Sequence, residues 1–457
     1  MDRGPSATSL LAAAVVGVYV LVVVGATAAL ADATAACGGW PVCGGAFSSP
    51  AVLVVLLHRA AALLVGLFVA VTAAVAWSDL EGRSRAALAV ALVLYPVQAG
   101  FGALVATGVG VAGVHLLVAM AIFASLVLAL AWHLEAETGT DDAASDPTPD
   151  PDPALEAPVA NPKPLSDLDG LERLRKSLWA YFKLMKPRLM WLLCLVAGAG
   201  MALAGTPTVR TVVATLGGGV LAIGASGTFN HVLERDVDRR MERTADRPVA
   251  THEVPVRNAL AFGGLLSVAA LGAFLSVNLL VAALGLAAIA FYSVIYTLVL
   301  KPNTVQNTVI GGAAGALPAL IGYAAIDGTL GLPGLALAGV IFLWTPAHFY
   351  NLALAYREDY ERGGFPMMPV VRGETETRKH VLLYLGATLL GASALTALAG
   401  LGWLYAAVTV ALGGVFLWAV VRLHRERTES AALRAFHASN AYLGLLLVAI
   451  VVDSLAV

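Results

Sequence analysis

The chain has 457 residues, of which 59% are hydrophobic and only 13% are charged, and its formal net charge is −2. A soluble domain carries about 25% charged residues, so this composition excludes an ordinary soluble protein. The balanced charge and the lack of a dense basic tail also argue against a nucleic-acid partner. Apolar runs of about 20 residues recur along the chain, the length that a helix needs to cross a bilayer, whereas β-barrel spans read as short alternating segments. We therefore expect an all-α polytopic protein embedded in the lipid bilayer.

Four helices are expected in the first part of the chain. The apolar run from Leu10 to Leu30 is longer than the hydrophobic region of a signal peptide, and further runs follow it directly, so we interpret it as a membrane helix. Residues 1–135 are thus predicted to form a four-helix bundle. Its helices should lie near residues 9–31, 51–77, 87–107 and 110–133.

A polar segment, residues 136–172, separates this block from the rest of the chain. It contains DDAASDPTPDPDPALEAPVANPKP, which is rich in Pro, Asp and Ala and has no hydrophobic periodicity. Such a composition cannot bury enough apolar surface to fold, so we expect a disordered acidic linker. Its acidic residues favour a solubilising role over a functional one.

Residues 173–457 form a second block with nine more candidate helices, which gives about 13 membrane helices in all. Their apolar runs lie near residues 186–205, 211–231, 258–275, 279–300, 307–325, 332–352, 380–400, 402–422 and 435–454.

Lys and Arg gather in alternate loops of this topology. If the N-terminus is cytoplasmic, the arginine-rich loops 232–257 and 353–379, and the loop after residue 422, all lie inside the cell. The intervening outer loops hold almost no Lys or Arg, with Arg210 as the exception. The positive-inside rule therefore predicts a multi-pass protein of the cell membrane, with its N-terminus and these loops in the cytoplasm.

Two cysteines lie in the predicted outer loop 32–50. Cys37 and Cys43 belong to the stretch CGGWPVC, whose five intervening residues include Gly and Pro and permit closure of a disulfide. Disulfides persist outside the membrane, so we expect this pair to be oxidised; metal ligation by two cysteines alone is the weaker alternative. Cys194 falls in an apolar helix and is expected to be inert.

Two histidines of the first block share one depth in the membrane. His58 and His115 lie about eight and six residues from the outer ends of their helices, so a rise of 1.5 Å per residue puts both roughly 10 Å below the outer surface. Two imidazoles at one level of a four-helix bundle can ligate one haem iron axially. Ionisable residues inside membranes are functional by default. The alternative is two unrelated packing histidines.

The first block resembles one four-helix half of the haem A synthase family. The matching stretches are CGGWPVCGG at 37–45, HRAAALLVG at 58–66, QAGFGALVATG at 98–108 and GVHLLVA at 113–119. Val55 stands where the family's catalytic half has a glutamate three residues before the first histidine, and the family's second haem-binding half is missing here. The resemblance implies that the block binds haem, passes it on, or completes a site with a second copy of this chain; a haem A synthase is another implied partner.

The second block carries oxygen-bearing side chains at a helix end. Asn230, Glu234 and Asp238 are spaced i, i+4 and i+8 in NHVLERDVDRRMERTADRP, so on a helix they share one face. Such a stripe suits Mg²⁺, which prefers carboxylate oxygens together with substrate phosphates. Arginine forks can pair with diphosphate oxygens. The alternative is a positive-inside loop whose acids only neutralise its arginines. The neighbouring candidates for diphosphate binding are Arg235, Arg239, Arg243 and Arg247.

A second acidic loop follows in WTPAHFYNLALAYREDYERGGFPMMPVV. Its Asp359 is a further candidate magnesium ligand, with Arg357 beside it as a candidate for substrate binding. Between the two loops, Tyr296 and Lys301 approach the same side of the membrane; Lys301 is either a diphosphate ligand or a snorkelling positive-inside residue. His348 could contact an acceptor, although an isolated membrane histidine more often serves packing.

Residues from about 178 to 455 resemble the intramembrane aromatic prenyltransferase superfamily, and within it the haem-prenylating branch. The resemblance implies a nine-helix bundle with a central cavity that opens to the lipid and a polar cap on the cytoplasmic side. It also implies farnesyl diphosphate as donor, haem B as acceptor and magnesium at the motif acids. The matching stretches are YFKLMKPR at 181–188, NHVLERDVDRRMERTADRP at 230–248, QNTVIGGAAGALPALIGY at 306–323 and WTPAHFYNLALAYREDYERGGFPMMPV at 344–370.

Two positions depart from the superfamily pattern. Glu234 stands where the first motif often has Asp, a conservative change. The second motif often has two aspartates four residues apart, whereas here Ala355 precedes Asp359. The leading functional hypothesis is a haem-farnesylating enzyme with a haem-binding block. The alternatives are a prenyltransferase for a quinone or lipid acceptor, and a haem-binding or haem-transfer protein without catalysis.

Overall fold

The computed structural model describes residues 6–30, 37, 39–43, 49–139 and 169–456. Within these ranges there is no β-strand, and 13 helices are long and apolar enough to cross a membrane. The expected all-α polytopic fold is confirmed. Most of the predicted linker, residues 140–168, lies outside the described residues.

The first four membrane helices follow the predicted apolar runs to within a few residues. They are α1 (Ala7–Leu30), α2 (Pro50–Ala76), α3 (Gly82–Ala106) and α4 (Ala112–Thr138). Both α3 and α4 extend beyond their apolar runs. Helix α3 begins earlier, in a segment with two arginines, and α4 ends later, in a segment with two glutamates.

These four helices belong to a compact unit that also contains most of the last three helices of the chain, α16 (Glu374–Ala399), α17 (Trp403–Glu426) and α18 (Glu429–Leu455). Buried hydroxyls connect the two sequence segments, because those of Tyr19 in α1 and Thr409 in α17 lie 3.0 Å apart. Thr409 also lies 3.3 Å from the hydroxyl of Tyr442 in α18. The packing unit therefore extends across the sequence boundary that we drew at residue 135.

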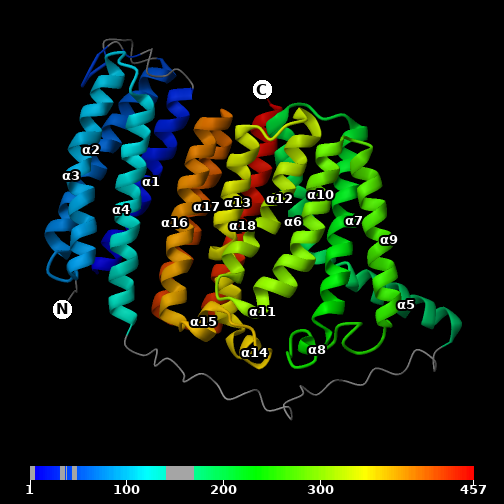
Figure 1. Cartoon of the computed structure of the whole chain (residues 1–457). Helices are drawn as coiled ribbons and strands as arrows, with labels where there is room; N and C mark the ends of the chain where they lie inside the picture. Colours follow the sequence, from blue (N-terminus) through cyan, green and yellow to red (C-terminus); the bar gives the residue numbers. More distant parts are fainter. Residues whose placement is uncertain (1–5, 31–36, 38, 44–48, 140–168, 457) are drawn as a thin grey trace. The chain divides into compact units, whose positions relative to one another are not determined.

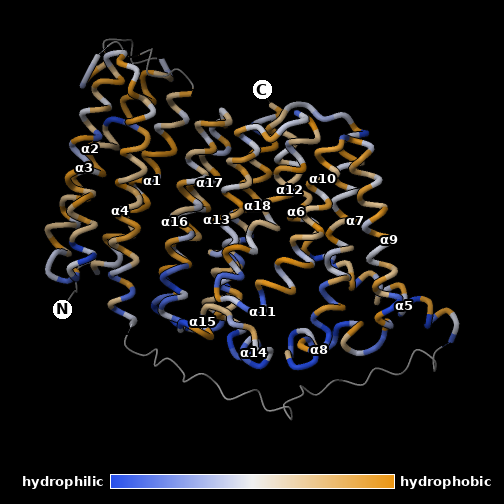
Figure 2. Tube along the Cα trace, viewed as in Figure 1, coloured by the Kyte–Doolittle hydropathy of each residue, from blue (hydrophilic) through white to orange (hydrophobic). Residues whose placement is uncertain are grey.

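A second compact unit holds the helices between residues 142 and 377. It comprises α5 (Gly170–Leu184), α6 (Pro187–Ala204), α7 (Val209–Leu233), α8 (Arg235–Asp238), α9 (Val256–Leu275), α10 (Leu279–Ala290), the π-helix η3 (Phe291–Leu300), α11 (Lys301–Asn303), α12 (Asn307–Asp327), α13 (Leu332–Ala355), α14 (Arg357–Arg362) and α15 (Met368–Val371). The short helices α8, α14 and α15 lie at one end of this unit, where hydrophilic residues gather (Figures 1 and 2); we call it the charged end.

Helix α5 was not expected from the sequence, because it is short and charged and has no membrane-length apolar run. Its apolar side chains Leu171, Leu174, Leu178 and Trp179 are all exposed, and the same helix carries Arg173, Arg175, Lys176 and Lys183. An amphipathic helix of this kind is suited to the boundary between lipid and water.

Helices α6 and α12 approach so closely that only glycine fits between them. A Cβ atom on Gly200 would lie 2.3 Å from the carbonyl oxygen of Ala319, and one on Gly322 would lie 2.0 Å from that of Ala197. Small residues allow such backbone contact in membrane bundles. This seam fixes α6 against α12 in the halves of the two helices that lie away from the charged end.

A candidate active site at the charged end

Asn230, Glu234 and Asp238 lie together where α7 ends and α8 begins. The backbone N–H of Glu234 donates to the carbonyl of Asn230 over 2.9 Å, and that of Asp238 donates to Glu234 over 2.7 Å, so the helical register continues through the join. All three side chains are buried. The structure thus brings the predicted stripe of oxygen donors to one place.

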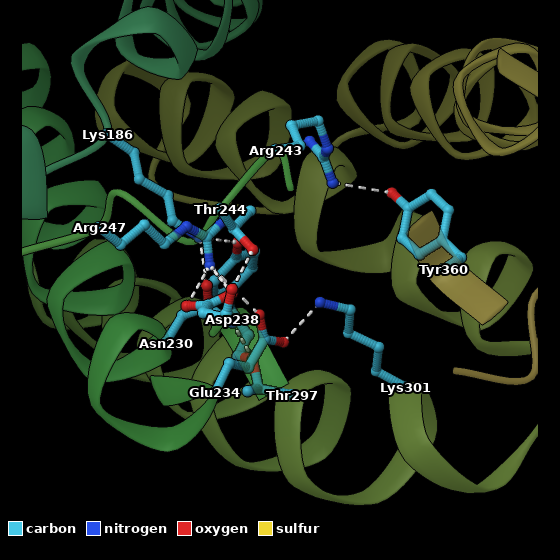
Figure 3. A network of polar contacts seen from close by, with 11 residues as sticks. Lys186, Asn230, Glu234, Asp238, Arg243, Thr244, Arg247, Thr297, Lys301 and Tyr360 are labelled. Atoms are coloured by element: carbon cyan, nitrogen blue, oxygen red, sulfur yellow. Dashed lines mark hydrogen bonds and ion pairs between the residues drawn. The ribbon is translucent and has the colours of Figure 1, made fainter. Parts of the chain in front are cut away.

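Three cations surround these oxygens (Figure 3). Lys301 donates to Glu234 Oε1 over 2.6 Å, and Arg247 Nη1 lies 2.7 Å from both carboxylate oxygens of Asp238. Lys186 donates to the amide oxygen of Asn230. Each of the three oxygen-bearing side chains therefore already has a positively charged partner.

The charges in this cluster do not cancel. Glu234 and Asp238 supply two negative charges, whereas Lys186, Arg247 and Lys301 supply three positive charges when all are ionised. A buried surplus charge is costly unless a counter-charge accompanies it. The cluster is therefore suited to an anionic ligand.

Shifted pKa values follow from this arrangement. Burial alone would raise the pKa of Glu234, but the charges of Lys301, Lys186 and Arg247 outweigh it and hold that pKa below its ordinary value. Burial, reinforced by the charge of Arg247, lowers the pKa of Lys186 to about 7. An anion that enters the cluster would favour the charged form of Lys186.

The sequence reasoning missed Lys186, although YFKLMKPR contains it. Its backbone has a φ of 54°, a left-handed conformation that is rare for a residue with a side chain and that directs the chain from α5 into α6. Lys-Pro pairs occur at 163–164, 186–187 and 301–302, so this pattern alone does not single out Lys186. Lys186 and Lys301 reach the same cluster.

The π-helix η3 supplies the next layer of contacts. Its Tyr292 accepts a hydrogen bond from Lys186 over 3.2 Å, and Thr297 accepts one from the amide of Asn230 over 3.1 Å. Tyr296, predicted at the site, lies one turn along η3 and packs against the backbone of Gly311. Because π-helical turns are wider than α-turns and recur at functional sites, η3 itself marks this region.

Asp359 occupies a different position from the other acids. Its carboxylate accepts hydrogen bonds from the backbone N–H groups of Glu242 (2.7 Å) and Arg243 (3.3 Å), and it pairs with Arg362 at 2.9 Å. It therefore braces the loop after α8. In the described part of the chain, no three residues among His, Cys, Asp and Glu are placed to share a metal ion.

The remaining predicted residues have other partners. Arg243 donates to the hydroxyl of Tyr360, and Arg239 donates to the carbonyl of Ala250. Three further side chains make contacts elsewhere, Arg235 with Asp236, Arg357 with Glu374, and His348 stacked on Trp344.

An apolar cavity begins at the cluster and runs into the bundle. Lys186 and Tyr292 form its polar end, and α6, α7, α10 and α12 supply mostly aliphatic or small walls. The walls farther from the charged end include Ala197, Thr215, Leu216, Phe274 and Ile321.

In the other compact unit, the predicted histidines both face the interior of the first four helices. The ring of His58 packs against Gly25 of α1, and that of His115 against Gly102 of α3, while Gln98 lies 3.2 Å from His115 Nε2. Both Nδ1 atoms are buried without a hydrogen-bond partner, which is unusual for buried polar atoms. Cys37 and Cys43 form a disulfide.

Fold and site define a polytopic membrane protein with a buried charged cluster at the polar end of an apolar cavity. Residues 191–446 match the family model described as the UbiA prenyltransferase family. This chain belongs to that family, in its protoheme IX farnesyltransferase branch, and is a prenyltransferase enzyme.

The relatives support the same placement over the whole length. The chain is 73% identical to Protoheme IX farnesyltransferase 1 of Natronomonas pharaonis, with 98% of this chain and 99% of the relative covered. It is 65% identical to Protoheme IX farnesyltransferase of Haloarcula marismortui, with both chains covered completely. A solved digeranylgeranylglyceryl phosphate synthase is similar in fold, at 14% identity and a TM-score of 0.53, over 62% of this chain and all of that chain.

Proposed function

We propose that this enzyme transfers the farnesyl group of farnesyl diphosphate to a vinyl group of protohaem IX (haem B), which yields haem O. The observation that carries the proposal is a buried cluster of three cations, of which Lys186 lies at the polar end of an apolar cavity. A prenyl diphosphate has the matching parts, an anionic head and a hydrocarbon tail. The names of the closely similar relatives support haem as the acceptor.

In this proposal Lys186, Arg247 and Lys301 bind the diphosphate, and the cavity receives the tail. Arg247 and Lys301 would exchange their present carboxylate partners for phosphate oxygens, which form charge-assisted bonds of similar strength. Arg243, held beside Tyr360, would be the next cation that the head group meets.

The donor set fits a magnesium ion. Once their cations turn to the diphosphate, Asn230, Glu234 and Asp238 present one amide and two carboxylate groups, hard oxygen ligands of the kind that Mg²⁺ prefers, and substrate phosphates and water complete such sites. We infer that these three residues hold the ion and that Asp359 acts chiefly by fixing the loop after α8. Bound magnesium would withdraw charge from the leaving diphosphate.

The protein's own groups account for the rest of the chemistry. The cations stabilise charge on the diphosphate as the bond between its oxygen and C1 of the farnesyl group breaks, with the electron pair leaving on oxygen. The apolar cavity excludes water from the allylic cation. The terminal vinyl carbon of haem bonds to C1, and water then adds to the resulting benzylic-type cation and loses a proton to give the hydroxyethyl group.

We further propose that the first four helices bind haem through His58 and His115. The support is the pair of buried, unpartnered imidazole nitrogens in one bundle. Because Val55 replaces the expected glutamate, the block would hold or deliver haem without oxidising it. A second copy of this chain, or a haem A synthase, is the partner that would complete a second site.

We also propose that the charged end faces the cytoplasm of the cell and that the loop containing Cys37 faces outward. The arginines of the loops beside α8 and α14 support this orientation in the cell membrane.

A competition experiment tests the choice of acceptor. Purified protein receives labelled farnesyl diphosphate, magnesium and equal amounts of haem B and a quinone precursor. The proposal expects label on haem. Label on the quinone precursor alone would overturn it in favour of the alternative prenyltransferase.

A further inference from the structure

Helix α5 exposes a row of apolar side chains along one side. The members of this apolar row recur every three or four residues and are all exposed, namely Leu171, Leu174, Leu178 and Phe182. Residues at this spacing share one face of a helix. Trp179 lies beside the row and is exposed as well. A continuous apolar face of this kind marks an interaction surface.

The other side of α5 packs on the ends of two membrane helices. Ala180 and Leu184 are buried in one cluster with Val232, in the last turn of α7, and Ala259, in the first turn of α9. Helix α5 therefore lies at the level where these spans end (Figure 1). In a bilayer, this level is the boundary between the hydrocarbon core and the headgroups. Tryptophan side chains such as that of Trp179 are enriched there.

The apolar row is continuous with the outer surface of α9. The lining of an open hollow between the two helices includes Leu178 of the row and Ala261 and Phe262 of α9. Farther along the same span, Leu265 and Val268 are exposed. Exposed apolar side chains of a membrane span face lipid. The bilayer is therefore the partner that covers both surfaces.

Basic side chains accompany the apolar row. At about 100° per residue, Lys176 and Lys183 fall between this row and the buried side of the helix. With the row in the bilayer, both would lie among the headgroups, where anionic lipids attract basic residues. The ion pair of Lys183 with exposed Asp246, at 3.9 Å, is weak enough for a lipid phosphate to replace it. In all, α5 has one acidic residue, Glu172, and four basic residues, Arg173, Arg175, Lys176 and Lys183.

The end of α5 is joined directly to Lys186 of the charged cluster. The backbone N–H of Lys186 donates to the carbonyl of Lys183 over 3.1 Å. This elbow rests on α7, since a Cβ atom on Gly227 would lie 2.9 Å from the carbonyl oxygen of Leu184. A shift of α5 would therefore move the Lys186 side chain within the cluster.

We propose that α5 is a lipid-binding element that positions Lys186. Its apolar row enters the bilayer, its basic side chains bind anionic headgroups, and this contact holds Lys186 in place for the diphosphate. The last step rests on the proposed function, in which Lys186 binds that group. Anionic lipid should therefore strengthen binding of the donor through the charges of α5.

The first experiment locates α5 in the membrane. The enzyme is placed in nanodiscs of phosphatidylcholine, either alone or mixed with phosphatidylglycerol. The fluorescence of Trp179 is obtained as the difference between the unaltered enzyme and Trp179→Phe. Lipids brominated on their acyl chains near the headgroup should quench this fluorescence, and more strongly in the mixed nanodiscs. A Trp179 signal that is unquenched in both would show that lipid does not cover the apolar row and would overturn the inference.

The second experiment tests the effect on the donor site. In each nanodisc, thermal protection gives the half-saturating concentration of a non-hydrolysable farnesyl diphosphate analogue. The variant that combines Arg173→Gln with Lys176→Gln should raise this concentration at least about fivefold over the unaltered enzyme in the mixed nanodiscs, the effect of one basic residue near an anionic surface. In phosphatidylcholine alone, the two proteins should bind the analogue equally.

The matched control combines Arg210→Gln with Arg257→Gln. Both are exposed arginines of the same compact unit that lie outside α5, so their loss should leave binding of the analogue unchanged. Equal binding by the α5 variant and the unaltered enzyme in the mixed nanodiscs would overturn the inference, and so would an equal loss in the control.

Transfer to haem is measured separately in the same nanodiscs. An enzyme that binds the analogue but leaves haem unchanged would refute the proposed function. Quenching of Trp179 and binding of the analogue would still decide the role of α5, because neither measurement requires an acceptor.

Discussion

Lys301 donates a hydrogen bond from its Nζ to Glu234 Oε1 over 2.6 Å, which joins the end of η3 to the end of α7. The pair is largely buried, and the ammonium group also lies over the ring of Phe365, 4.1 Å from its centre. Two membrane helices are thus fixed by one ion pair at the mouth of the cavity. The same pair keeps Glu234 ionised before any ligand arrives.

This pair predicts a separation between stability and activity. Lys301→Met removes the nearest cation of buried Glu234 and leaves it Arg247, which is 3.6 Å away and already pairs with Asp238, so the change should destabilise the protein by about 3 kcal/mol and strongly reduce transfer. Adding Glu234→Gln removes the carboxylate charge that has lost its nearest cation, so the double variant should regain most of the thermal stability but not the turnover. Thermal unfolding in detergent and a farnesyl transfer assay give the two quantities. Recovery of turnover in the double variant would show that the pair serves structure only.

Asp238→Ala and Asn230→Ala should each reduce farnesyl transfer by at least about 100-fold, as expected when a group that stabilises the charge of a leaving group is removed. Both proteins should still be inserted in the membrane. Asp236→Ala is the control, because Asp236 lies in the same segment but is exposed and pairs with Arg235 and Arg239. Near-normal turnover in both site variants would refute the metal assignment.

The sequence predicted the membrane helices well, because each follows from an apolar run that no tertiary contact can disguise. It also predicted the Asn230, Glu234 and Asp238 stripe, since a register within one helix is a local property. Lys186 and Tyr292 were missed because they reach the site only when α6, α7 and η3 pack together. The position of Asp359 was equally unpredictable, since it depends on how the loop after α8 folds back on α14.

In the full chain, His58 and His115 should ligate one low-spin haem. Either His→Ala change should remove one axial ligand and shift the optical spectrum toward high spin, and the double change should remove most of the bound haem. Gln98→Ala is an informative comparison, because Gln98 contacts His115 without being a ligand. Low-spin bands that survive both histidine changes would contradict this assignment.

Cys37 and Cys43 should be oxidised on the outer side of the membrane. An impermeant maleimide added to intact cells should label the chain only after reduction, and Cys37→Ser should make Cys43 reactive without reductant. Cys194 lies within α6 and should stay unlabelled throughout. Labelling of both thiols without reductant would exclude the disulfide.

The most direct test of the account is the mass of the haem product. Purified protein is incubated with haem B and farnesyl diphosphate, with and without magnesium, and the haem is extracted for mass spectrometry. We expect haem that is heavier by one farnesyl group and one hydroxyl group, formed only with magnesium and absent with the Asp238→Ala variant. Unmodified haem under all conditions, while farnesyl diphosphate is consumed, would contradict it.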